Sequence, residues 1–205
     1  MLSSPAQAAL LRASSSMSVI RQKHGGQGGL ADRVVNRLIE KSFKVVAFDF
    51  DQTIVKLHTF FNKITPSNVH ERKELKDDFA DAKLFQDIVH KLHEHKIHVA
   101  VASFGYRDVI EAYLKEVIPS EFEHITILSR ESSLSKSKML RELSIIHEDD
   151  SRIPKSQIVL FDDDQRNCTF CLKAGYQAYL VDSSIGINQD FWSQWLELTD
   201  MPVDE

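Results

Sequence analysis

Several kinds of residue are scarce in this chain of 205 residues, and each scarcity narrows the class of protein. Two cysteines, Cys168 and Cys171, are too few for a disulfide framework, so we expect a reducing, cytoplasmic compartment. No apolar run approaches the ~20 residues that a membrane-spanning helix requires, so we expect no membrane partner. The net charge of -5 provides no basic patch, so we expect no nucleic-acid partner.

Acidic residues are missing from the N-terminal stretch that precedes Asp32, where basic residues are interleaved with small and apolar ones. That composition is typical of a mitochondrial or plastid transit segment, and a flexible tail is the alternative. The glycines of HGGQGGL, residues 24–30, indicate a linker. We therefore expect residues 1–30 to be a flexible tail or a transit segment, and residues 31–205 to form one domain with a buried core.

Apolar strands alternate with amphipathic helices along the rest of the chain. Continuous apolar runs predict strands buried on both faces, and apolar residues spaced three or four apart predict helices. The predicted strands are 44–50, 97–103, 124–129, 157–164 and 176–182, and the predicted helices are 31–43, 81–95, 106–118, 135–146 and 167–174. This order predicts an α/β domain with a parallel sheet and helices on both of its faces.

Apolar stripes on helical segments predict how these segments pack. The first helix carries a stripe of Val34, Val35, Leu38 and Ile39, which we expect to be buried. The C-terminal stretch 191–198 is rich in tryptophan and phenylalanine, and we expect it to pack on the domain rather than to bind a partner. The two cysteines lie inside a predicted helix, where a packing role is favoured over a redox role.

Polar side chains follow three of the predicted strands. Asp49 and Asp51 end the first strand, Ser103 ends the second, and Asp162 and Asp163 end the fourth. Ligands of open α/β sheets bind outside the carboxyl ends of the strands, so we expect these side chains to meet. Converging carboxylates repel one another unless a cation lies among them, and Mg²⁺ prefers carboxylate ligands. We expect Mg²⁺ to be held by Asp49, Asp162 and the backbone carbonyl of Asp51.

Such a site permits phosphoryl transfer. A carboxylate held by Mg²⁺ beside a phosphate can attack phosphorus and form an aspartyl phosphate. Asp51 can then serve as the acid for the leaving alkoxide and as the base for the attacking water. Ser103 can donate a hydrogen bond to the phosphoryl group, and a lysine can add positive charge. Lys136 is the preferred lysine because an apolar stripe follows it in register, and Lys138 is the alternative.

The motifs of the chain resemble those of the haloacid dehalogenase (HAD) superfamily. FDFDQT resembles the first motif of that superfamily, DxDxT, and VAVASF resembles the second. Lys136 resembles the third motif, and VLFDDDQRN is similar to the fourth. The resemblance implies a Rossmann-like fold, Mg²⁺ and phosphoryl transfer. It assigns Asp49 as nucleophile, Asp51 as acid and base, and Ser103 and Lys136 as phosphate binders.

The resemblance also implies the rest of the site. Asp162 becomes a metal ligand, with Asp163 supporting the metal. The motif residues Thr53, Phe104 and Gly105 complete the expected substrate-binding and phosphate-binding set. Because the segment between the first two motifs is short, the chain resembles the members with minimal or no cap, near the magnesium-dependent phosphatase-1 group. Two departures from the pattern of that group are Gln52 and Met139.

We therefore expect an enzyme, a Mg²⁺-dependent phosphomonoester hydrolase that acts through an aspartyl phosphate. Its substrate would be a phosphorylated small molecule or a phosphoprotein, and the protein would be a monomer or a homodimer. Two alternatives stay open. One is a binding or scaffold protein that keeps the HAD fold without catalysis, and the other is a HAD phosphotransferase or mutase that passes the phosphoryl group to a sugar.

Overall fold

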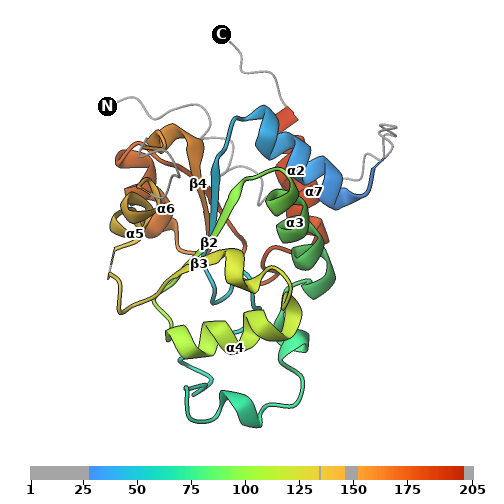
Figure 1. Cartoon of the computed structure of the whole chain (residues 1–205), viewed down its shortest axis with the longest axis vertical. Helices are drawn as coiled ribbons and strands as arrows, with labels where there is room; N and C mark the ends of the chain where they lie inside the picture. Colours follow the sequence, from blue (N-terminus) through green and yellow to red (C-terminus); the bar gives the residue numbers. More distant parts are fainter. Residues whose placement is uncertain (1–27, 134, 146–151, 201–205) are drawn as a thin grey trace.

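A five-stranded sheet lies at the centre of the computed structural model, which describes residues 28–133, 135–145 and 152–200 (Figure 1). All four strand pairings are parallel, in the order β3-β2-β1-β4-β5. The strands are β1 (Val45–Phe48), β2 (His98–Ala102), β3 (Ile125–Leu128), β4 (Ile158–Asp162) and β5 (Gln177–Leu180). The predicted α/β class with a parallel sheet is confirmed.

Helices cover both faces of the sheet (Figure 1). One face packs against α2 (Leu30–Glu40), α3 (Ala82–Glu94) and α7 (Gln189–Asp200). The helix α4 (Arg107–Val117) joins the same apolar cluster from beyond the ends of the strands, next to α3. The other face packs against α5 (Lys136–Leu143) and α6 (Gln165–Lys173). The helices change from one face of the sheet to the other after β3. The chain runs outward from β1 to β3 and then crosses to the other side of β1. Right-handed crossovers that run in opposite directions along a sheet place their helices on opposite faces.

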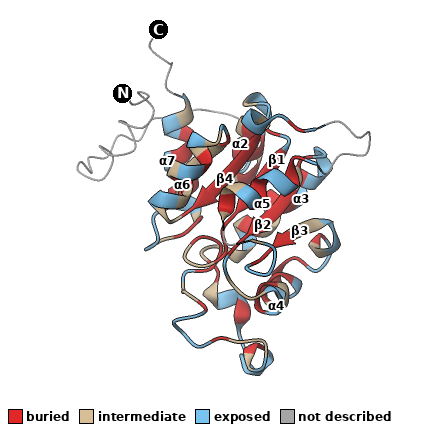
Figure 2. Ribbon diagram, turned by 90° about the vertical axis from the view of Figure 1, so that its left-hand side faces the viewer, coloured by how far each residue is buried: buried red, intermediate tan, exposed pale blue. Residues whose placement is uncertain are grey.

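The alternation of side chains along β1 divides the core in two. Val46 and Phe48 belong to the larger apolar cluster under α2, α3 and α7, whereas Val45 and Ala47 belong to the smaller cluster under α5 and α6. All four side chains are fully buried, as the red central strands of Figure 2 show. The uninterrupted apolar run of β1 therefore corresponds to a strand that is buried on both faces.

The stripe predicted for the first helix was wrong at one position. Val34, Val35 and Leu38 are buried, but Ile39 is 39% exposed, and Ala31 is buried instead. Each residue advances by about 100° around a helix, so Ile39 lies at the margin of a stripe centred on the other three. The predicted strands and helices are also longer than the observed elements by one or more residues at most ends.

The C-terminal helix α7 packs on the sheet, as its sequence predicts. Trp192 and Trp195 are buried, and their rings meet the ring of Phe161 edge-on at centroid distances of 5.0 and 5.8 Å. Cys168 and Cys171 are buried free thiols in α6, which agrees with a packing role. None of the described helices is long and apolar enough to cross a membrane.

The segment between β1 and α3 contains two short 3-10 turns, Val69–Glu71 and Leu75–Asp78, and forms no separate domain among its described residues. It buries Ile64, Val69 and Phe79 against the main core. This arrangement is a minimal cap. Most of the predicted tail at residues 1–30 lies outside the described residues, so the tail and the limits of the domain stay predictions.

Replacement of Trp192 by alanine tests the packing of α7. Truncating a fully buried tryptophan removes apolar contacts and leaves a cavity, so we expect the free energy of unfolding to fall by about 3–5 kcal/mol. The matched control is Leu198→Ala in the same helix, because Leu198 is 41% exposed. Urea denaturation measures both variants, and equal losses would contradict a helix that packs through Trp192.

Candidate active site

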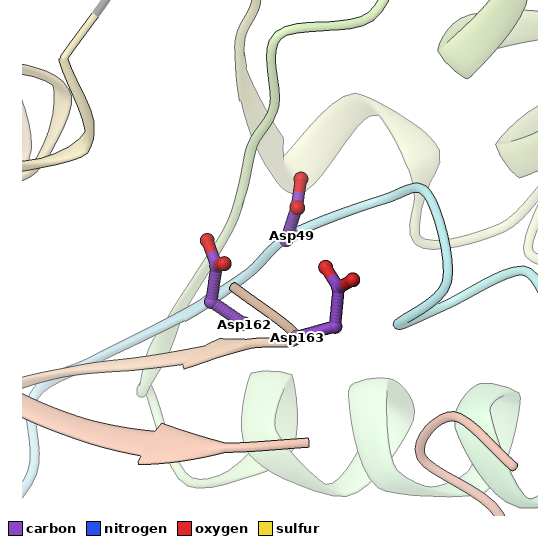
Figure 3. A group of neighbouring side chains, drawn as sticks. All are labelled: Asp49, Asp162 and Asp163. Atoms are coloured by element: carbon purple, nitrogen blue, oxygen red, sulfur yellow. The ribbon is translucent and has the colours of Figure 1, made fainter. Parts of the chain in front are cut away.

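The register of the sheet brings two aspartates side by side. Phe48 of β1 pairs with Val101 of β2 and with Phe161 of β4. One residue further along, Asp49 therefore lies next to Asp162, and both side chains point to the face covered by α5 and α6. Figure 3 shows Asp49, Asp162 and Asp163 projecting the same way from the strand ends. One carboxylate oxygen from each of the three lies within 4.8 Å of the other two.

Lys136 pairs with two of these three aspartates. Its Nζ is 2.7 Å from Oδ1 of Asp49 and 3.0 Å from Oδ2 of Asp162, and it donates a hydrogen bond to the backbone carbonyl of Ala102. Only 2% of Lys136 is exposed. Burial by itself would lower the pKa of Lys136, but the two carboxylates outweigh it and raise this pKa. The side chain is therefore a buried ammonium ion.

One ammonium ion does not balance the acidic group. Burial is the main cause that raises the pKa of Asp49 to about 7. The positive charge of Lys136 opposes this rise, and the negative charge of Asp162 adds to it. Burial and the charge of Asp162 likewise raise the pKa of Asp163 to about 6. Three oxygen ligands this close, with negative charge in excess, are the donor set that a hard divalent cation prefers. The residues present therefore fit Mg²⁺.

Asp162 is fixed by the start of α6. The side-chain amide of Asn167 donates to its Oδ1 at 3.0 Å, and the backbone N–H of Asp164 donates to the same oxygen at 2.9 Å. Asp164 in turn caps α6 by accepting from the backbone N–H of Arg166 at 2.8 Å. Asn167 was not predicted as a site residue, although it lies within the stretch VLFDDDQRN that is similar to the fourth motif.

Asp51 points away from the acidic group. Its Oδ1 accepts hydrogen bonds from Thr59, one from the backbone N–H at 3.0 Å and one from the hydroxyl at 2.8 Å. Nδ1 of His58 lies 3.2 Å from Oδ2 of Asp51, although the two atoms do not have hydrogen-bond geometry. The carboxylate of Asp51 is thus separate from the candidate metal ligands. Its backbone carbonyl as a metal ligand stays a prediction.

The loop after β2 supplies polar groups to the same edge. Ser103 is buried, and its Oγ accepts a hydrogen bond from the backbone N–H of Gly105 at 3.1 Å. A Cβ atom at Gly105 would lie 3.4 Å from this Oγ, so the loop has little room for a side chain. Phe104 is partly exposed, and the Nζ of Lys136 lies 5.0 Å from its ring centroid.

Two residues of the predicted set lie elsewhere. Thr53 is fully buried and does not line the pocket, and its hydroxyl has no hydrogen-bond partner among the described residues. Its backbone carbonyl accepts from Ile187 at 3.0 Å, which ties the loop after β1 to the segment before α7. Lys138 is exposed and lies outside the pocket. Of the two candidate lysines, only Lys136 contacts the aspartates.

A pocket of about 460 Å³ opens over the acidic group. Of the predicted residues, Asp49, Asp51, Asp163, Ser103, Phe104 and Gly105 line it. The remaining residues of the lining lie outside the predicted site set, and they are Gln52, His58, Thr59, Phe60, Tyr106, Arg130, Asp164 and Asn167. Arg130 follows the end of β3, so the rule about the carboxyl ends of strands would have found it.

A larger cavity of about 980 Å³ lies at the opposite edge of the sheet, beside the starts of β2 and β3. Histidine, lysine and glutamate side chains line it, but the only group of described residues arranged to hold a metal ion is the aspartate group. We therefore place the candidate active site at the smaller pocket.

Removal of the ammonium group tests the charge balance of the site. Lys136→Met leaves the buried carboxylates of Asp49 and Asp162 without their partner, so we expect the free energy of unfolding to fall by about 3–5 kcal/mol. The matched control is Lys138→Met on the same helix, where an exposed side chain is worth at most about 0.5 kcal/mol. Urea denaturation in the presence of a chelator measures both, and similar losses would contradict the ion pairs.

This chain is similar to known proteins in sequence and in structure. A family model described as "Acid Phosphatase" matches residues 41–200. No curated protein matches the chain. One solved structure that resembles it is a haloacid dehalogenase-like hydrolase from Bacteroides fragilis, with 16% sequence identity and a TM-score of 0.46. That comparison covers 74% of this chain and 93% of the other.

Proposed function

The chain belongs to the acid phosphatase family, and on this premise we propose that it hydrolyses phosphomonoesters with Mg²⁺ through an aspartyl phosphate on Asp49. The family match confirms the predicted resemblance to HAD-type phosphatases and the prediction of an enzyme. The observation that carries the finer proposal is that Lys136 pairs with both Asp49 and Asp162, while Asp49 and Asp51 line the same pocket.

Asp49 is the proposed nucleophile. Its Oδ1 forms an ion pair with the Nζ of Lys136 at 2.7 Å and accepts a hydrogen bond from the backbone N–H of Phe50 at 2.6 Å. These two donors fix the orientation of the carboxylate at the pocket floor. A carboxylate held in this way is a nucleophile that needs no base to activate it.

Asp49, Asp162 and Asp163 would hold the Mg²⁺ ion, together with the backbone carbonyl of Asp51. Bound Mg²⁺ would offset the excess negative charge and attract phosphate oxygens to the pocket. Asp162 is suited to this role because Asn167 and the start of α6 already fix its carboxylate. Because the carboxylate of Asp162 is already held in place, less free energy is needed to arrange it around a metal ion.

The phosphoryl group would be bound by Ser103, Gly105 and Lys136. Because the Ser103 hydroxyl accepts from Gly105, its own proton is available for a phosphate oxygen. Lys136 adds positive charge where negative charge develops in the transition state. Phe104 lines the pocket as a substrate contact. The position of Thr53 gives it a structural role in the loop rather than a contact with phosphate.

Asp51 is the proposed acid and base. Its side chain lines the pocket, and its carboxylate is not among the candidate metal-binding carboxylates, so this carboxylate is free to exchange a proton. It would protonate the leaving alkoxide when Asp49 attacks phosphorus. It would then accept a proton from the water that hydrolyses the aspartyl phosphate.

A phosphatase acts on phosphorylated substrates, and the segment between β1 and α3, which lines the pocket with His58, Thr59 and Phe60, forms no separate cap domain. This arrangement supports either a phosphorylated small molecule or a phosphoprotein as substrate. The grouping near magnesium-dependent phosphatase-1, the monomeric or homodimeric state and the compartment stay predictions. Product analysis distinguishes transfer of the phosphoryl group to water from transfer to a sugar.

Replacement of the nucleophile tests the assignment of Asp49. Asp49→Asn keeps the shape of the side chain but removes its nucleophilic charge, so we expect kcat for an aryl phosphate to fall by at least about a thousandfold. Asp190→Asn, on the exposed side of α7, is the control and is expected to keep full activity. Circular dichroism checks that both variants fold, and retained activity in a folded Asp49→Asn protein would refute the assignment.

Binding of Mg²⁺ can be tested without turnover. A ligand that binds only the folded state stabilises it, by about 2.7 kcal/mol when its concentration is 100 times Kd. We expect Mg²⁺ to raise the Tm of the metal-free wild type and to have a much smaller effect on Asp162→Asn. Differential scanning calorimetry measures both proteins, and an equal rise in Tm would place the ion away from Asp162.

A further inference from the structure

Thr59 binds one oxygen of Asp51 with two donors. Its backbone N–H lies 3.0 Å from Oδ1 of Asp51, and its hydroxyl lies 2.8 Å from the same oxygen. Only 3% of Thr59 is exposed. A carboxylate oxygen accepts about two hydrogen bonds in its plane, so Oδ1 has no free position for a substrate or a water molecule.

The backbone of the loop holds Thr59 in place. The carbonyl of Phe50 accepts from the N–H groups of Ile54 at 3.0 Å and Val55 at 3.1 Å, which folds the chain sharply after β1. The turn contains Gln52, whose φ of 55° lies in the left-handed region. The carbonyl of Thr59 accepts from Ile64 at 2.9 Å. The backbone of Thr59, including the N–H that binds Asp51, is therefore positioned by the loop.

The other oxygen of Asp51, Oδ2, remains available for chemistry. The side chain of Asp51 lines the pocket. The nearest ring nitrogen, Nδ1 of His58, is 3.2 Å from Oδ2 but makes no hydrogen bond there. The ring of His58 packs on Phe61 at a centroid distance of 4.2 Å, which holds it beside the carboxylate.

We propose that Thr59 is a positioning residue that holds Asp51 by Oδ1 so that Oδ2 transfers the proton. In the first step a bond forms between Asp49 and phosphorus, the bond from phosphorus to the leaving oxygen breaks, and the proton on Oδ2 moves to that oxygen. In the second step water bonds to phosphorus, the bond between Asp49 and phosphorus breaks, and a proton of the water returns to Oδ2. This inference rests on the proposed function of Asp51.

A series of phosphate esters with different leaving groups tests the role of Thr59. Alkyl phosphates need a proton on the leaving oxygen, whereas p-nitrophenyl phosphate has a leaving group that departs readily as an anion. Thr59→Val removes the hydroxyl and keeps the shape of the side chain. We expect its kcat/KM to fall by about 10–100-fold for alkyl phosphates and by less than about threefold for p-nitrophenyl phosphate. Thr59→Ser keeps the hydroxyl and is expected to restore the wild-type pattern.

A merely structural role of Thr59 predicts a different result. Damage to the pocket as a whole lowers kcat/KM by a similar factor for every ester, and that outcome, or no change at all, overturns the proposal. Thermal melting reports the folding of each variant. Thr59→Ala replaces Thr59→Val if the latter does not fold, and failure of both to fold while Thr59→Ser folds also overturns the proposal.

Asp51→Asn separates this inference from the proposed function. If Asp51 is the acid, Asp51→Asn shows the same selective loss on alkyl phosphates, and to a larger degree. A selective loss in Asp51→Asn without one in Thr59→Val refutes only the role of Thr59. A uniform loss in Asp51→Asn refutes the role of Asp51 as acid, and the inference about Thr59 falls with it.

Discussion

The buried ammonium ion of Lys136 is the interaction on which the site depends. It contacts Asp49 and Asp162, which come from different strands, and it also binds the end of β2 through the carbonyl of Ala102. A buried charge is costly unless oppositely charged or hydrogen-bonding groups surround it. Burial of the Lys136 ammonium group therefore requires that the ends of β1, β2 and β4 come together with α5. Met139, Leu140 and Leu143 share the inner face of α5 with Lys136 and anchor the helix on the sheet.

The two aspartates of the first motif are separated by the way the chain leaves β1. Asp49 continues the pleat of the strand and faces α5 and α6, next to Asp162. After Phe50 the chain turns sharply, and Asp51 is directed to the loop, where Thr59 binds it. One carboxylate is thus placed with the candidate metal ligands, and the other is placed apart from them with a free oxygen. This separation fits the proposed roles of Asp49 as the nucleophile and of Asp51 as the acid.

The sequence predicts the parts of the fold that depend on local pattern. Uninterrupted apolar runs predicted a parallel sheet because its strands are buried on both faces. The stripe that begins at Lys136 favoured it over Lys138, and only Lys136 contacts the aspartates. The contacts of Asp51 with Thr59 were not predictable, because the loop between them has no periodicity and its turn depends on backbone hydrogen bonds. Thr53 was expected in the pocket because of its motif, but it is buried outside the pocket lining, and its backbone carbonyl accepts a hydrogen bond from the distant residue Ile187.

The central claim is that the carboxylate of Asp49 bonds covalently to phosphorus during turnover. Rapid quenching of the Mg²⁺-loaded enzyme with an aryl phosphate, followed by peptide mass spectrometry, tests this claim most directly. The account predicts an acyl phosphate on the peptide that contains Asp49, formed within one turnover and sensitive to hydroxylamine. Turnover without any phosphorylated aspartate, or with the phosphoryl group on another side chain, would contradict it.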